Sequence, residues 1–124
     1  MAKPAPISEA EWVVMEVLWK KSPQTAAAVV QALKEKKWAA NTVRTLLARL
    51  VKKGVLSYAE DGNRYLYRAT VPREICVQEE VASLTSRVFG GAIRPLLLHF
   101  VQNEKLTAGE IAELRAILDG KEPK

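Results

Sequence analysis

Residues 39–54 combine a helical apolar period with an opposite face made only of uncharged polar, small and cationic side chains. The apolar residues recur at the spacing of a single α-helical stripe, at Val43, Leu46, Leu47, Leu50 and Val51. Gly54 is expected to end this helix. A helix with such a stripe is stable only when the stripe is buried, so the rest of the chain must build a core against it.

The face opposite the stripe carries no carboxylate. Its residues, flanks included, are Asn41, Thr42, Arg44, Thr45, Ala48, Arg49 and Lys52. Hydrogen-bonding and cationic side chains suit phosphates and base edges, and the small Ala48 allows close approach. A solvated helix face is the alternative, and the helix alone does not decide between the two.

Two β-type runs follow the helix, at residues 55–60 and 64–70. Between them Asp61-Gly62-Asn63 offers residues that tolerate positive φ, which predicts a hairpin. Arg64 at its tip and Arg68 further along can reach a DNA backbone, although arginines are common on any hairpin. A helix followed by a hairpin with a basic tip indicates a winged helix-turn-helix.

Positive charge is concentrated in the first part of the chain. The net charge is +5, but residues 1–71 hold 12 Lys and Arg against 6 Asp and Glu, whereas residues 72–124 hold 7 against 8. Cations bind DNA by releasing its counterions, so residues 1–71 are the candidate reader of double-stranded DNA.

Two helices are expected before the central one. Ser8 and Glu11 have the spacing of a capping box that opens the first, which ends near Lys20-Lys21. Thr25 is expected to cap a second helix that runs to about Lys36. Their inner faces are predicted at Trp12, Met15, Leu18 and Trp19, and at Ala26, Val29, Val30 and Leu33, and Trp38 is expected to pack in the core.

Three strongly apolar helices are expected after Pro72. The first runs to about Phe89, the second holds Pro95 in its first turn, and the third starts with a capping box at Thr107 and Glu110. Three such helices can hardly cover one another, which favours burial against a second copy over a monomeric bundle. The predicted dimerisation residues are Val77, Val81, Leu84, Val88, Ile93, Leu96, Leu97, Phe100, Ile111, Leu114 and Leu118, and Ile117 shares the last apolar face.

Several separated segments resemble the penicillinase-repressor family (BlaI/MecI type), in the same order. In the first part of the chain the segments are residues 8–12, Trp38 followed by residues 42–46, residues 49–54 and residues 65–67. In the second part they are residues 79–80, 89–91, 95–96 and 100–101. The resemblance implies a dimeric winged-helix repressor whose operators are inverted repeats. Copper-responsive relatives carry paired C-x-C motifs near the C-terminus, which this sequence lacks.

The resemblance also implies how repression ends. In the family, a membrane-bound sensor with a metalloprotease domain triggers cleavage of an Asn-Phe bond within the dimerisation element, in response to antibiotics acting at the cell wall. The matching bond here is His99-Phe100, so His stands where the family has Asn.

Enzymatic and metal-binding functions find no support in the sequence. The single His99 and the single Cys76 lie more than twenty residues apart, and neither a nucleophile with its base nor a set of metal ligands is present. No cofactor is expected, and Cys76 is expected to be buried. No run of 18 apolar residues exists, so we expect a cytoplasmic protein without membrane insertion.

The sequence therefore predicts a mainly α fold with a small β-hairpin wing. Residues 1–71 would form the winged helix-turn-helix domain and residues 72–124 a helical dimerisation domain. The expected function is a homodimeric repressor of palindromic operators. The alternatives are a winged-helix module for protein–protein assembly and a metal-responsive repressor of the copper type.

Overall fold

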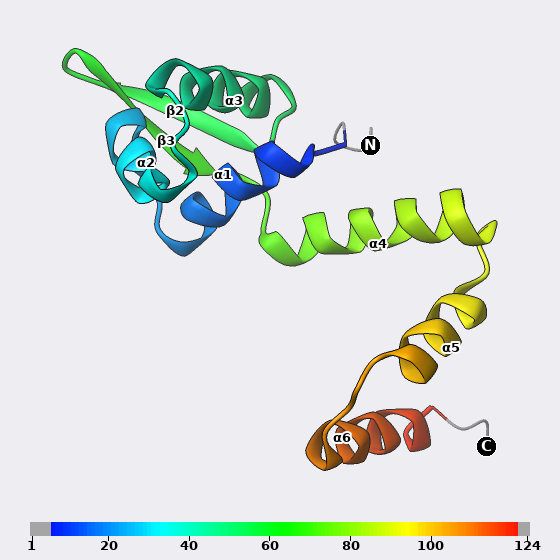
Figure 1. The fold of residues 1–124 in the computed structure, drawn as a ribbon. Helices are drawn as coiled ribbons and strands as arrows, with labels where there is room; N and C mark the ends of the chain where they lie inside the picture. The colour runs from blue at the N-terminus through cyan, green and yellow to red at the C-terminus, as the bar shows by residue number, and fades with distance from the viewer. Residues whose placement is uncertain (1–5, 122–124) are drawn as a thin grey trace. The chain divides into compact units, whose positions relative to one another are not determined.

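The computed structural model describes residues 6–121 and divides the chain into two compact units. The first unit ends at Glu80 and the second begins at Val81, so the boundary falls inside a helix. The elements in order are α1 (Glu9–Lys20), β1 (Gln24–Thr25), α2 (Ala26–Ala32), the 3₁₀-helix η1 (Lys34–Lys36), α3 (Ala40–Lys52), β2 (Leu56–Asp61), β3 (Arg64–Ala69), α4 (Arg73–Phe89), α5 (Ile93–Asn103) and α6 (Ala108–Asp119). The predicted fold class, mainly α with a small hairpin in a winged helix-turn-helix, is confirmed (Figure 1).

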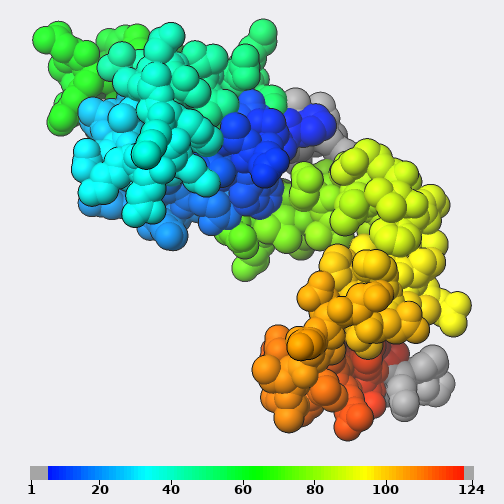
Figure 2. Space-filling model, viewed as in Figure 1, coloured from blue at the N-terminus to red at the C-terminus, as the bar shows by residue number. Residues whose placement is uncertain are grey.

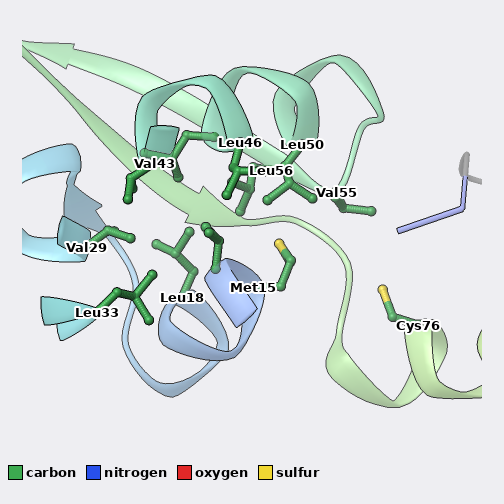
Figure 3. Packing of buried hydrophobic residues seen from close by; sticks show 12 residues of the cluster. Met15, Leu18, Val29, Leu33, Val43, Leu46, Leu50, Val55, Leu56 and Cys76 are labelled. Carbon is green, nitrogen blue, oxygen red and sulfur yellow. The ribbon is translucent and has the colours of Figure 1, made fainter. Parts of the chain in front are cut away.

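The core of the first unit lies between α1, α2, α3 and the sheet. Met15 and Leu18 from α1, Val29 from α2 and the apolar stripe of α3 point into one cluster (Figure 3). Val14, Met15, Val29, Leu47, Leu50 and Val55 are completely buried. The predicted inner faces are confirmed in their main residues, whereas Trp12, Trp19 and Trp38 are half-buried and pack against this cluster.

The sheet has three strands, one more than the sequence predicts. Its order is β1-β3-β2, and both pairings are antiparallel. In the hairpin, Asp61 stands opposite Arg64, and Gly62 in the turn has a φ of 65°. The two-residue strand β1 pairs Gln24 with Tyr67, which fastens the loop after α1 to the hairpin. The hairpin extends beyond α2 and α3 (Figure 2).

The second helix is shorter than predicted. α2 ends at Ala32, and η1 replaces the last turn of the helix that was expected to reach Lys36. The apolar face stops at Leu33, and Lys34, Glu35 and Lys36 are all exposed, so no packing holds them in α geometry. Lys37 then adopts a left-handed φ of 58°, which turns the chain towards Trp38.

The three helices after Pro72 begin and end close to their expected positions. The capping box of Thr107 and Glu110 is present at α6, and Pro95 lies in the first turn of α5. Large apolar side chains nevertheless remain exposed on the single chain, among them Val88, Ile93, Leu97, Ile117 and Leu118. The helices do not cover one another's apolar faces in the way that a monomeric bundle would require.

Candidate nucleic-acid interface

The face of α3 that points away from the core is the best candidate for a DNA contact. Every predicted residue of that face is exposed, namely Asn41, Thr42, Arg44, Thr45, Ala48, Arg49 and Lys52. Ala39, the N-cap, offers no side-chain acceptor, so the first amide groups of α3 stay available to an outside acceptor. No carboxylate occurs in α3, and therefore nothing on this helix repels a phosphate.

Two interactions shape the first half of this face. The Thr45 hydroxyl donates a hydrogen bond to the backbone oxygen of Asn41, one turn earlier, at 2.9 Å. Arg44 lies near the hairpin, since its charge acts on Tyr67. Burial raises the pKa of Tyr67 and the neighbouring Tyr65 and Tyr58 raise it further, while Arg44 opposes them. Arg44 itself is exposed.

A buried ion pair holds α3 against α1. The Glu11 carboxylate is only 2% exposed and accepts hydrogen bonds from the Lys53 ammonium and from the backbone N–H of Ser8, the latter at 2.8 Å. Burial raises the pKa of Glu11, but the hydrogen bonds from Lys53 and Ser8 and the charge of Lys53 outweigh it and leave the pKa below its usual value. Lys53 directly follows α3, so this pair fixes where the candidate interface ends relative to α1.

The wing carries cations and aromatic rings on opposite faces. The rings of Tyr58, Tyr65 and Tyr67 pack together in tilted and edge-to-face arrangements, with 4.6 Å between the ring centroids of Tyr58 and Tyr65. Arg64 and Arg68 alternate with the tyrosines along β3 and therefore project from the other face. Arg64 is paired with Asp61 at 3.2 Å in an exposed position, so its charge is partly balanced before any DNA arrives.

The predicted dimerisation residues divide into buried and exposed ones. Leu96 is 6% exposed, and Val77 and Leu84 are half-buried. The other eight are exposed on the single chain: Val81, Val88, Ile93, Leu97, Phe100, Ile111, Leu114 and Leu118. These side chains come from all three helices after Pro72.

The bond predicted to be cleaved lies one turn before the end of α5. His99 and Phe100 are both exposed, and their rings stand 5.7 Å apart. The side-chain amide of Asn103 donates to the backbone oxygen of His99 at 2.7 Å. The backbone here is helical, and a protease needs it extended, so a cut at this bond requires the last turn of α5 to unwind first.

Cys76 is buried at the edge of the core cluster, which confirms its expected location (Figure 3). Burial raises the pKa of its thiol, and the charge of Glu79 adds to this effect. Within residues 6–121 no group of three His, Cys, Asp or Glu side chains is placed to hold a metal ion. No helix in that same range is long and apolar enough to cross a membrane.

Sequence reasoning missed the buried role of Glu11 and its partner Lys53. The Ser8–Glu11 spacing was sufficient to predict the capping box, and that local explanation left no reason to look for a partner 42 residues away. A carboxylate flanked by Val14, Met15 and Leu18 on a buried helix face was the signal available, because a buried charge needs a counter-ion.

Comparison with known sequences finds the same family over nearly the whole chain. The family model for the penicillinase repressor matches residues 7–120. A penicillinase repressor from Bacillus licheniformis is 33% identical over 120 residues, which is 96% of this chain and 94% of that protein. The methicillin resistance regulatory protein MecI of Staphylococcus aureus (strain N315) is 34% identical, with 93% and 94% covered.

Two solved structures resemble the first part of the chain. The solution structure of the DNA-binding domain of the repressor BlaI has a TM-score of 0.54 and 36% identity, covering 59% of this chain and 90% of that one. The solution structure of monomeric Bacillus licheniformis BlaI in complex with the blaP half-operator has a TM-score of 0.51 and 35% identity, covering 60% and 92%.

Proposed function

This chain belongs to the penicillinase repressor family, a family of transcriptional repressors and not of enzymes, and on that premise we propose that it represses genes as a homodimer on palindromic operator DNA. The observation that carries the proposal is the face of α3, whose residues are all exposed and which is cationic and free of carboxylates. The BlaI domain that it resembles binds the blaP half-operator, which supports the same partner for this chain.

In the proposed complex α3 enters the major groove. Its first turns bring Arg44, Asn41, Thr42 and Thr45 to base edges or nearby phosphates. Arginine suits guanine through two parallel hydrogen bonds, and asparagine suits adenine. The other cations, Arg49, Lys52 and Arg64, are assigned to the phosphate backbone, where they add affinity without reading sequence.

The second chain of the dimer is proposed to cover the exposed apolar side chains of α4, α5 and α6. Exposed leucine, isoleucine and phenylalanine side chains from three helices are costly to leave in water, and a second copy offers the same surface in return. A two-fold axis presents the same α3 to each half-site, so the operator must be an inverted repeat.

Repression is proposed to end when the His99–Phe100 bond is cut in a pathway that begins at a membrane-bound sensor of cell-wall antibiotics. The cut removes the end of α5 and all of α6 from the apolar surface. Two DNA-binding units that no longer share a dimer bind independently and lose an avidity of about 10²–10⁴. The operator then empties although no DNA contact has changed.

The DNA assignment is tested with Arg44→Ala in a gel-shift titration. The cognate inverted repeat is first selected from randomised duplexes with the wild-type chain. Arg44→Ala should weaken binding to this repeat by about 1–3 kcal/mol and binding to random DNA far less. Arg115→Ala on α6 removes the same charge and serves as the control. Equal losses on both DNAs would make Arg44 a phosphate contact, and no binding by the wild type would favour an assembly module.

The cleavage assignment is tested by intact-mass spectrometry of the chain from cells exposed to a β-lactam. Fragments that end at His99 and begin at Phe100 are expected as the target genes switch on. Intact chains in fully derepressed cells would refute cleavage as the trigger.

A further inference from the structure

The first turns of α4 are built into the first unit rather than tethered to it. The unit boundary falls at Glu80, so residues 73–80 of α4 belong with α1–α3 and the sheet. Cys76, one turn into the helix, is 4% exposed and packs in the core cluster. The base of α4 is therefore held by the packing of the first unit.

Two side chains of α1 hold this junction directly. The indole N–H of Trp19 donates to the backbone oxygen of Val71 at 2.9 Å, just before α4 begins. The carboxylate of Glu16 accepts from the guanidinium of Arg73, the first residue of α4, at 2.8 Å. The same Glu16 oxygen accepts from the indole of Trp12 at 3.0 Å, which restrains its position on α1. These polar contacts hold the start of α4 to α1, whereas the Glu11–Lys53 pair holds the end of α3 to α1.

We propose that Glu16, Trp19 and Arg73 are positioning residues that determine which spacing between half-sites the dimer accepts. The proposal rests on the proposed function, in which α4 connects the DNA-binding unit to the dimer surface. None of the three residues belongs to the face of α3, so their effect is on the placement of the two units and not on the reading of a half-site.

The length of α4 makes a small change at its base matter. A helix of 17 residues is about 25 Å long. A tilt of about 10° at its first turn displaces its far end by about 4 Å, by simple leverage on that length. One base pair advances a half-site by about 3.4 Å and rotates it by about 35°. The displacement at the far end of α4 is thus comparable to the translation that one added base pair produces, without its rotation.

The two contacts that α1 makes with the start of α4 differ in strength. The Glu16–Arg73 pair is exposed on both sides, and such pairs contribute little on their own. The Trp19–Val71 hydrogen bond is partly buried, and its loss leaves a carbonyl with poorer access to water. We therefore expect Trp19→Phe to weaken the preference for one half-site spacing more than Arg73→Ala does. The double variant should weaken this preference most.

The experiment measures affinity for three kinds of duplex with the full-length chain. These are an isolated half-site, the selected inverted repeat, and the same repeat with one or two base pairs inserted between the half-sites. The wild type should lose at least about 10-fold on the inserted sites, because two linked reading units must engage together. The Trp19→Phe/Arg73→Ala variant should bind the original repeat about 3–10-fold more weakly and discriminate between spacings less than about 3-fold, with half-site affinity unchanged.

A charge swap separates positioning from folding. Glu16→Arg alone should relax the spacing preference, and adding Arg73→Glu should restore it, although Trp12 lacks its acceptor in both variants. Arg87→Ala is the control for charge on the same helix, since Arg87 donates a hydrogen bond to Ser83 within α4. It should keep the wild-type spacing preference.

Each outcome decides the matter. Unchanged spacing discrimination in the double variant, or failure of the swap to restore it, would overturn the proposal while the proposed function stands. A parallel loss on the isolated half-site would assign these residues to the fold of the first unit instead. Absence of any cooperative gain from the wild-type chain on the full repeat would refute the dimeric function itself, and the inference with it.

Discussion

In the first unit Val14, Met15 and Leu47 are completely withdrawn from solvent, whereas in the second Ile117 and Leu118 are more than half exposed. Both regions are rich in apolar residues, so apolar content does not explain this difference in burial. The first unit has several elements packed around one cluster, while the second has helices whose apolar faces remain uncovered on a single copy. The first unit completes its core from its own residues, whereas the second leaves many large apolar side chains exposed on the single chain.

Local helix signals are equally clear on both sides of this divide. A complete capping box opens α1 in the first unit, and another opens α6 in the second. Capping fixes where a helix begins, but it stabilises by only about 1 kcal/mol and buries nothing. The difference between the units therefore lies in packing, and variants that alter the packing of each unit test it.

The largest effect is expected from removing the second unit. A chain that ends at Glu80 keeps Cys76 and the contacts of Trp19 and Glu16, and should fold as a monomer. Its affinity for the full inverted repeat should fall by about 10²–10⁴, since the avidity of two linked reading units is lost, while half-site affinity persists. Sedimentation and gel-shift titration check this. A full-length chain that sediments as a monomer at micromolar concentration would contradict the pairing of second units.

Next comes a matched pair of leucine truncations. Leu47→Ala empties a fully buried site in α3 and should lower the free energy of unfolding by about 2–5 kcal/mol at any protein concentration. Leu118→Ala, at a site that is 59% exposed on α6, should act mainly by weakening the dimer, so its effect should grow on dilution. Thermal unfolding of both variants at two concentrations measures this. An effect of Leu118→Ala that is independent of concentration would indicate burial within one chain.

A smaller effect concerns the Glu11–Lys53 pair in the first unit. Glu11→Gln should cost about 1–2 kcal/mol, since the ammonium of Lys53 loses its counter-ion but is partly exposed. Because the pKa of Glu11 is lower in the folded state, its contribution is present above the usual value of 4.5 and is lost as the pH falls through the folded-state pKa. Unfolding of the chain truncated at Glu80 between pH 7 and pH 3 should show this loss in the wild type. An equally steep acid loss in Glu11→Gln would assign the acid sensitivity to other carboxylates.

The smallest effects are expected from removing single charges. They are measured as the salt dependence of binding to an isolated half-site, which does not require a dimer. Arg49→Ala and Lys52→Ala should each reduce the slope of log K against log salt by about 0.9. Arg64→Ala should change it less, because Asp61 already balances that charge. Arg115→Ala in the second unit should leave the slope unchanged. A reduced slope for Arg115→Ala would place DNA on the second unit too.

Much of the first unit was predictable because its determinants are local. The Ser8–Glu11 box, the stripe of α3 and the Asp61-Gly62 turn each lie within a few residues and were placed correctly. The strand β1 was not predicted, since two residues are too few to show a β-type alternation. Gln24 is part of a strand only because it pairs with Tyr67, 43 positions later. The early end of α2 was not predicted either: its apolar face stops at Leu33, and the exposed residues 34–36 have no packing to hold them in α geometry.

The candidate interface was predictable as a surface and not as a set of contacts. A carboxylate-free face follows directly from helical spacing, and all seven of its residues are exposed. The pairing of Arg64 with Asp61 and the junction of Trp19 with Val71 depend on side-chain geometry, which spacing does not contain. The assignment of single residues to bases, phosphates or the dimer stays a prediction.

The hydrogen bond between Thr45 and Asn41 limits which bases Thr45 can recognise in the proposed complex. A hydroxyl has one proton, and here it is already given to the Asn41 carbonyl. What Thr45 presents to the outside is an acceptor and a methyl group. In the major groove an acceptor matches the amino groups of adenine and cytosine, and a methyl group matches the methyl of thymine. Guanine offers only acceptors there, so a helix that keeps this bond has a residue that disfavours guanine at the one position Thr45 faces.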